Sequence, residues 1–260
     1  MEEIAYAKIN LELRVRRRRD DGYHDIDTLF AFAEDGDRLR VAEGEGLELD
    51  IVGPFASDLS GPEDNLVLRA ARLLDCGRGA RLTLDKRLPV ASGIGGGSAD
   101  AAAVLRLLVR WWDLGLGRAE LMALAGHLGA DVPACLLSRT MRGTGRGDRL
   151  EPDGAEAELA GKPVLLVNPG VALSTAEVFG RWSGIEADGN DLEPAALELA
   201  PAIGEVLAEL RAYPGVELAR MSGSGATCFA LFESEAERDG AAAAIAADRP
   251  RWWRLASRLR

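Results

Sequence analysis

The chain has 260 residues, of which 47% are apolar and 28% charged, a composition typical of a globular protein with one large domain or two modest ones. Its net charge of −11 would repel both nucleic-acid phosphates and anionic lipid, so neither kind of partner is expected. No apolar run approaches the roughly 20 residues that span a bilayer and no secretory signal is recognisable, so we expect a cytoplasmic protein. Cys76, Cys135 and Cys228 are scattered as buried thiols usually are, and two histidines make a zinc site improbable.

The first half of the chain alternates strand and helix patterns. Residues 5–15 alternate as in a half-buried strand, which places Lys8 and Asn10 on the same polar face. The basic run at residues 16–19 is interpreted as the charged end of a hairpin, with a turn at residues 20–22. Further strands are predicted over residues 26–33, 38–42, 47–52 and 81–85, and helices over residues 66–74, 98–112 and 118–128.

The second half begins after a polar, glycine-containing stretch at residues 151–162. We place a domain boundary there, which gives domains of residues 1–155 and 156–260. Strands are predicted over residues 164–167, 227–232 and 252–259, and helices over residues 194–213 and 234–247. The last helix opens with Ser234 and Glu237 at the spacing of a capping box.

A glycine-rich stretch at residues 93–98 lies between a predicted strand and a predicted helix. Glycines let the backbone approach a ligand closely, and the amides and dipole of a helix start attract phosphate oxygens. The stretch lacks the lysine of a Walker loop, and Ser98 replaces the third glycine of a dinucleotide fingerprint. It therefore predicts a phosphate site, with a structural tight turn as the alternative. Glycine clusters at residues 143–147 and 222–225 could close over the same ligand or form hairpin connections.

Several segments resemble the GHMP kinase superfamily: residues 7–11 with 21–24, then 89–100, then 222–226. Within it, residues 21–24 and 129–133 resemble the family of kinases that act on 4-diphosphocytidyl-2-C-methyl-D-erythritol, and the match runs in order across nearly the whole chain. The resemblance implies an α+β, two-domain GHMP kinase fold. In that fold an N-terminal ribosomal-protein-like, nucleotide-binding domain and a C-terminal ferredoxin-like domain hold the active site in the cleft between them.

The same resemblance implies the reaction and the residues that perform it. ATP, with Mg2+, would phosphorylate the 2-hydroxyl of the cytidine-linked methylerythritol, a step of the non-mevalonate isoprenoid pathway. Lys8 and Asp131 match the catalytic pair. The residues that match the nucleotide site are Asn65, Lys86, Pro89, Val90, Ala91, Ser92, Gly93, Ile94, Gly95, Gly96, Gly97, Ser98 and Ala99. Those that match the acceptor site are Asn10, Tyr23, His24, Phe30, Asp131, Thr175, Phe179, Gly223 and Ser224.

The chemistry of these side chains suits such roles. A hydroxyl is a poor nucleophile, so a carboxylate such as Asp131 that accepts its proton makes phosphoryl transfer feasible. Lys8 can orient that carboxylate and offset the developing charge. Tyr23 and His24 can stack on a cytosine ring and bond its edge.

Other interpretations remain open at this point. Judged without the resemblance, Asp131 could cap the next helix and Lys8 could be solvated surface. Rival functions are another GHMP kinase, acting on a mevalonate derivative, homoserine or a sugar, and a non-catalytic nucleotide-binding paralogue. The expected partner is a small-molecule substrate, and the expected state is a monomer or weak homodimer. The chain departs from the family at Ala31, where relatives often carry glutamine, and over residues 142–146, which are unusually basic.

Overall fold

The structure is a computed structural model that describes residues 1–59, 65–74 and 76–260. The chain forms two compact units, each built from separate segments. Unit 1 comprises Met1–Ala7, Asp35–Val90 and Gly95–Ser138, and unit 2 comprises Lys8–Glu34, Ala91–Ile94 and Arg139–Arg260. Residues 155 and 156, which flank the predicted domain boundary, both belong to unit 2. The boundary therefore stays a prediction about sequence domains, which these interleaved units do not test.

Two long strands open the chain, β1 (Glu2–Arg18) and β2 (His24–Ala42), and the predicted turn at residues 20–22 connects them. Each strand contributes residues to both units. The strand predicted over residues 5–15 is confirmed and extended at both ends, since β1 is 17 residues long.

The prediction of two separate strands over residues 26–33 and 38–42 was wrong, because β2 continues through the polar residues between them. Gly36 lies against β1 so closely that a Cβ on it would be 1.9 Å from a backbone oxygen of that strand. Asp37 is fully buried. These two residues have a turn-like composition but occupy interior positions of a sheet, so composition alone suggested a break that the fold does not contain.

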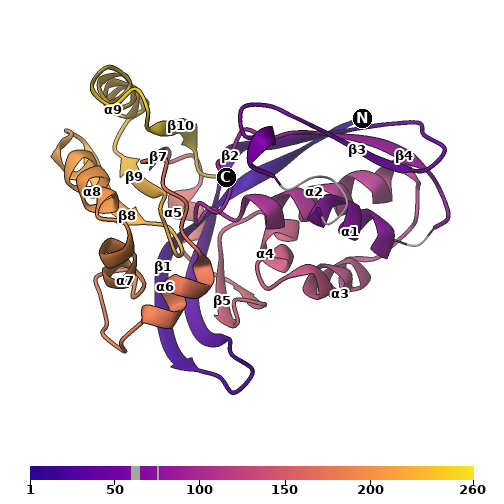
Figure 1. Cartoon of the computed structure of the whole chain (residues 1–260), viewed down its shortest axis with the longest axis horizontal. Helices are drawn as coiled ribbons and strands as arrows, with labels where there is room; N and C mark the ends of the chain where they lie inside the picture. Colours follow the sequence, from indigo (N-terminus) through magenta and orange to yellow (C-terminus); the bar gives the residue numbers. More distant parts are fainter. Residues whose placement is uncertain (60–64, 75) are drawn as a thin grey trace. The chain divides into compact units, whose positions relative to one another are not determined.

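Unit 1 packs helices against one face of a sheet (Figure 1). The C-terminal part of β2 pairs antiparallel with β4 (Ala80–Asp85), which pairs in parallel with β3 (Leu47–Val52). The helical segments are η1 (Ala56–Asp58), α1 (Leu66–Leu73), α2 (Gly96–Trp111), α3 (Arg118–Leu128) and α4 (Val132–Leu137). The α2 side chains predicted to be apolar and inward, among them Val104, Leu105 and Leu108, are fully buried. The long apolar face of α2 therefore anchors its N-terminus, where the glycine-rich stretch ends.

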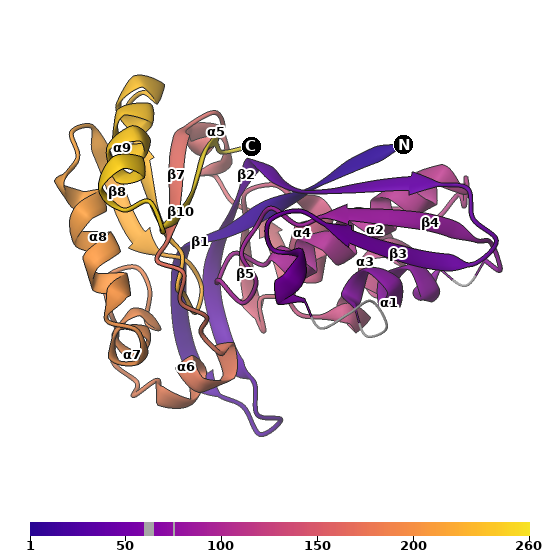
Figure 2. The ribbon, with the colours of Figure 1, turned by 45° about the horizontal axis from the view of Figure 1, so that its top comes forward.

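Unit 2 contains an antiparallel sheet in the order β10–β7–β9–β8, with α8 and α9 along it (Figures 1 and 2). Its strands are β7 (Pro163–Asn168), β8 (Val216–Met221), β9 (Cys228–Phe232) and β10 (Trp253–Arg258). The N-terminal part of β2 also pairs with β5 (Met141–Gly145), which continues into β6 (Arg149–Pro152). The helices are α5 (Glu156–Leu159), α6 (Thr175–Arg181), α7 (Glu193–Leu199), α8 (Ala202–Ala212) and α9 (Glu235–Asp248).

The single helix predicted over residues 194–213 is in fact two, α7 and α8. Pro201 explains the break, because a proline disfavours helical geometry in the residue before it. Ala200 accordingly has φ −141° and ψ 82°, and Pro201 becomes the N-cap residue of α8. The helix predicted over residues 234–247 is confirmed, and Ser234 accepts a hydrogen bond from the Glu237 amide as its capping box requires.

Two expectations from composition can be compared with the structure. Cys135 and Cys228 are buried free thiols as predicted, whereas Cys76 is half-buried. In the part of the chain that the structure describes, no helix has both the length and the apolar character needed to cross a membrane.

Candidate active site

Lys8 and Asn10 lie side by side on β1, as the strand period predicted. The Lys8 ammonium donates to Asn10 Oδ1 at 2.8 Å, and Asn10 Nδ2 donates to Thr28 Oγ1 at 2.8 Å. The ammonium also lies 5.2 Å from the centre of the Phe30 ring. Lys8 is only 4% exposed, so the alternative that it is solvated surface is wrong. A lysine this deeply buried has a fixed position, which is what a group acting on a reacting centre needs.

The glycine cluster at residues 222–225 packs directly on the glycine-rich stretch. Ser222 Oγ donates to the Gly93 carbonyl at 3.0 Å and accepts from the Asn10 amide at 3.1 Å. The Thr227 amide donates to the Ser92 carbonyl at 3.1 Å. A Cβ on Gly93 would lie 2.4 Å from the Ser222 carbonyl oxygen, so glycine is needed where the two backbones meet. Lys8 and Asn10 are thereby connected to the middle of the stretch within unit 2.

The glycine cluster at residues 143–147 and the 222–225 cluster differ in what they contact. Residues 143–147 lie at the connection between β5 and β6, so the hairpin alternative holds for this cluster. Ser224 Oγ and Thr175 Oγ1 are 3.0 Å apart, so the 222–225 cluster also contacts the start of α6.

The glycine-rich stretch ends at an uncapped helix start in unit 1. Gly95 has φ +63° and is the N-cap residue of α2, and no side chain caps the first amides of this 16-residue helix. The first turn contains Gly96, Gly97 and Ser98, and Gly97 is exposed. Uncapped amides and the positive end of the helix dipole are the recurrent elements of an anion site. The helix begins two residues earlier than predicted, which places the glycines in its first turn.

A buried charged cluster lies beneath that helix start. The Lys86 ammonium donates to Asp37 at 2.5 Å and to Asp100 at 2.8 Å, and all three side chains are almost completely buried. Burial raises the pKa of Asp100 to about 7, against the opposing effect of the Lys86 charge. The pKa of Lys86 is raised too, because the two carboxylates outweigh the cost of its own burial. Burial of Asp100 therefore favours its protonated form, while the Asp37 carboxylate accepts three hydrogen bonds.

Asn65 and Asp131 both stand at helix starts in unit 1. Asn65 Oδ1 accepts from the Val67 amide at 2.9 Å and caps α1. Asp131 occupies the N-cap position of α4, but its carboxylate makes no capping hydrogen bond. The alternative that Asp131 serves as a helix cap is therefore wrong.

Aromatic side chains gather around His24 in unit 2. The His24 ring lies 4.9 Å from Phe179 and 5.9 Å from Trp182, measured between ring centres. The pKa of His24 is lowered, chiefly by burial and further by the charge of Arg18, so the ring is neutral at pH 7. Neighbouring Tyr23 is 53% exposed, a position from which its ring can stack on a ligand.

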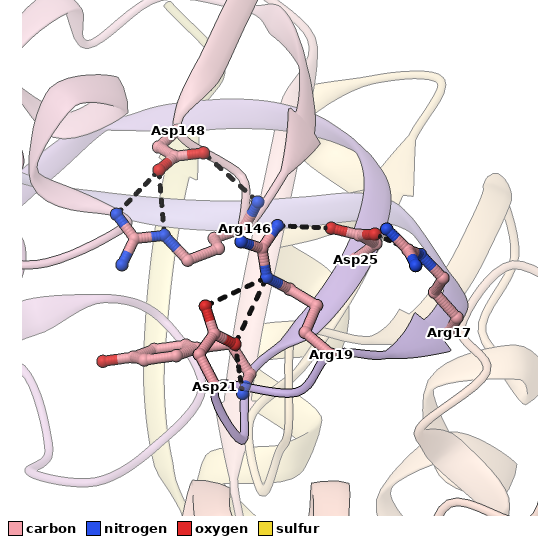
Figure 3. Close-up of polar contacts among 7 residues, drawn as sticks. Arg17, Arg19, Asp21, Asp25, Arg146 and Asp148 are labelled. Atoms are coloured by element: carbon pink, nitrogen blue, oxygen red, sulfur yellow. Dashed lines mark hydrogen bonds and ion pairs between the residues drawn. The ribbon is translucent and has the colours of Figure 1, made fainter.

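Arg16, Arg17 and Arg19 of the basic run at residues 16–19 pair with acidic side chains of the same hairpin. Figure 3 shows Arg19 between Asp21 and Asp25, with Arg17 also on Asp25. The Arg19–Asp25 and Arg17–Asp25 distances are 2.8 and 2.6 Å, and these bonds lower the pKa of Asp25. The interpretation as a charged hairpin end is confirmed.

Arg146 belongs to the same region of unit 2. Its guanidinium pairs with Asp148 at 2.8 Å (Figure 3) and lies 5.1 Å from the centre of the Tyr23 ring. One face of that ring is therefore next to a fixed cation.

Comparisons with known proteins identify the family of the chain. Residues 65–139 match the model described as GHMP kinases N terminal domain, and residues 169–250 match the one described as GHMP kinases C terminal. A 4-diphosphocytidyl-2-C-methyl-D-erythritol kinase of Rhizorhabdus wittichii is 58% identical over 278 residues, which cover 99% of this chain and 94% of the relative. The chain belongs to the GHMP kinases, in the family of that relative. It is therefore a kinase, as predicted.

Solved structures support the same family. A crystal structure of 4-(cytidine 5'-diphospho)-2C-methyl-D-erythritol kinase has a TM-score of 0.83 and 36% identity, and the match covers 100% of this chain and 99% of the other. The homoserine kinase of Cytophaga hutchinsonii has a TM-score of 0.68 over 99% of this chain and 94% of its own, but at 18% identity it shows the fold alone. The predicted two-domain α+β GHMP kinase fold is confirmed.

Several residues around the candidate site were not identified from the sequence. Asp37 fell between two predicted strands, and Asp100 lay inside the matched segment at residues 89–100 without a role. Asn190 donates to the carbonyls of Met221 and Gly223, both at 2.8 Å, and so supports the 222–225 cluster.

Proposed function

We propose that this kinase transfers the γ-phosphoryl group of ATP to the 2-hydroxyl of 4-diphosphocytidyl-2-C-methyl-D-erythritol, in the non-mevalonate isoprenoid pathway. The observation that carries the proposal is the 58% identity, over 99% of the chain, with a relative of that name. The aromatic side chains around His24 support the same acceptor, because a cytosine ring is bound by stacking and by hydrogen bonds to its edge.

ATP binds through residues 89–99, together with Asn65 and Lys86. The uncapped first turn of α2 supports this role, since it presents main-chain amides rather than bulky side chains. The close backbone packing at Gly93 fixes the middle of the stretch. With no Walker lysine in the stretch, backbone amides and the helix dipole carry the attraction for phosphate.

Mg2+ accompanies the nucleotide. Outside residues 60–64 and 75, the chain has no group of three or more His, Cys, Asp or Glu side chains that could hold a metal ion. In kinases Mg2+ takes many of its ligands from phosphates and water and neutralises charge on the transferred group. The ion would therefore bind mainly to ATP, next to the first turn of α2.

Asp131 accepts the proton of the 2-hydroxyl as its oxygen bonds to the γ-phosphorus. The bond from that phosphorus to the β,γ-bridging oxygen breaks, and ADP leaves with the electron pair. Lys8 offsets the negative charge that develops on the transferred group. Asn10 and Phe30 support this step by holding the Lys8 ammonium.

The acceptor is held by residues of unit 2. Tyr23, His24 and Phe179 enclose the cytosine ring, and neutral His24 bonds its edge. The remaining acceptor contacts are assigned to Asn10, Phe30, Thr175, Gly223 and Ser224. Asn10 and Ser224 support this assignment, because both are connected by hydrogen bonds to the 222–225 cluster and its surroundings. The enzyme works in the cytoplasm as a monomer or weak homodimer.

Replacement of Asp131 by Asn tests the proposed base. The change keeps the shape but removes the proton acceptor, so we expect kcat to fall by about 10²- to 10⁴-fold. ATP affinity, measured by calorimetry without acceptor, should stay within twofold. Asp50→Asn, at an exposed position of β3, is the matched control and should keep wild-type kcat. Wild-type turnover by Asp131→Asn would exclude Asp131 as the base.

A further inference from the structure

The Asp37 carboxylate binds the chain at the point where β4 leads into the glycine-rich stretch. Asp37 Oδ1 accepts hydrogen bonds from the backbone amides of Arg87, at 2.5 Å, and Leu88, at 2.8 Å. Its second oxygen, Oδ2, accepts from the Lys86 ammonium at 2.5 Å. A single side chain of β2 therefore fixes three consecutive residues immediately before Pro89.

Lys86 extends this connection to the other end of the stretch. Its ammonium also donates to Asp100 Oδ2 at 2.8 Å, and Asp100 lies one residue after Ala99 in α2. A Cβ on Gly96 would lie 3.0 Å from the same ammonium, so the charge lies directly beneath the first residue of the helix. The cluster of Asp37, Lys86 and Asp100, all in unit 1, thus joins the two ends of residues 89–99.

Stability alone is a weak reason for such a cluster. Asp37, Lys86 and Asp100 are 0, 2 and 3% exposed, and removing charges from water to this degree offsets much of the gain from pairing them. Two carboxylates facing one ammonium are less favourable still, and Asp100 Oδ1 is buried without a hydrogen-bond partner in the structure. What the cluster supplies is geometry, because a buried ion pair at these distances tolerates little displacement.

We propose that Asp37, Lys86 and Asp100 are positioning residues for nucleotide binding, which hold the two ends of residues 89–99 so that the first-turn amides of α2 face the ATP phosphates. They act through the backbone and through α2. Lys86 directs at least two of its three donors to the carboxylates, so its contribution to ATP binding comes largely from the loop it supports. The inference rests on the proposed role of residues 89–99 in binding ATP.

Asp37→Asn and Asp100→Ala test this role. Asp37→Asn keeps the side-chain volume but removes the carboxylate that accepts from Lys86, and Asp100→Ala removes the oxygen of α2 that Lys86 contacts. Asp100→Ala carries the test if Asp37→Asn does not fold. ATP affinity is measured by calorimetry without acceptor, and KM is measured for each substrate. We expect the Kd and KM of ATP to rise about tenfold or more, a loss of about 1.4 kcal/mol. The KM of the cytidine substrate, at saturating ATP, should change less than twofold.

Glu3→Gln is the matched control. Glu3 pairs with Arg106 of the same helix, α2, at 2.8 Å and is also largely shielded from solvent. Its loss should lower thermal stability without changing the Kd of ATP. An ATP affinity within twofold of wild type in folded Asp37→Asn or Asp100→Ala, or an equal loss in Glu3→Gln, would overturn the positioning role. Wild type that binds no ATP would instead overturn the proposed nucleotide site, so the two failures are distinguishable.

Discussion

Substitution of Gly93 by Ala perturbs the contact between the glycine-rich stretch and the 222–225 cluster. Gly93 has φ +79°, and a left-handed conformation costs an alanine about 1–2 kcal/mol. The new Cβ would also lie 2.4 Å from the Ser222 carbonyl oxygen and 2.7 Å from that of Gly225, both backbone atoms. Forcing an extra methyl group into packed surroundings costs about 1–3 kcal/mol. We therefore expect Gly93→Ala to lower the free energy of unfolding by about 2–5 kcal/mol.

Urea denaturation followed by circular dichroism measures this loss, and the KM of ATP reports the displaced loop. Gly126→Ala is the matched control. Gly126 lies inside α3, and a Cβ there would have no neighbour within 4 Å, so alanine should stabilise the helix by about 0.5–1 kcal/mol. The reasoning would be refuted if Gly93→Ala unfolded at the same urea concentration as wild type, or shifted in the same direction as Gly126→Ala.

Two further predictions concern the acceptor site and the buried cluster. Phe179→Ala removes the ring that lies 4.9 Å from His24. In steady-state assays the KM of the cytidine substrate should therefore rise about tenfold, while the KM of ATP is unchanged. An unchanged KM of the cytidine substrate would exclude the stacking role. The pKa of Asp100 is raised from 3.8 to about 7, chiefly by burial, so between about pH 4 and 7 the folded chain holds a proton that the unfolded chain has lost. This group's contribution to stability therefore falls as pH rises through that window, and Asp100→Asn should gain stability relative to wild type in Tm measurements from pH 4 to 7. Parallel Tm curves for the two proteins would contradict the assignment.

Local sequence patterns predicted most elements because these elements depend on near neighbours. The period of β1 placed Lys8 and Asn10 on one face, and their hydrogen bond confirms it. The capping residue Ser234 predicted the start of α9. The apolar periodicity of residues 194–213 predicted one helix, although Pro201 interrupts it. The strand β8 was not predicted at all, and its pairing with β9 contains a register irregularity between Val216 and Leu218.

The site was predictable only where residues belong to a continuous motif. Asp37 lies 49 positions from Lys86 in the sequence, and no local pattern indicates that the two meet. Lys8 and Asn10 likewise contact another strand, Lys8 through the Phe30 ring and Asn10 through Thr28. A polar side chain looks the same in a sequence whether it is solvated or enclosed, so burial had to come from the fold. The family resemblance supplied the proposed roles, and the structure supplied the partners that fix these residues.

The central claim is the identity of the acceptor, and a coupled assay of ADP release tests it most directly. The purified chain is given ATP and Mg2+ with 4-diphosphocytidyl-2-C-methyl-D-erythritol, and in parallel with homoserine, mevalonate or galactose. The account predicts that ADP release depends on the cytidine substrate, with one phosphate transferred per ADP, and stays at background with the others. Release at background with the cytidine substrate, or faster release with another acceptor, would contradict it.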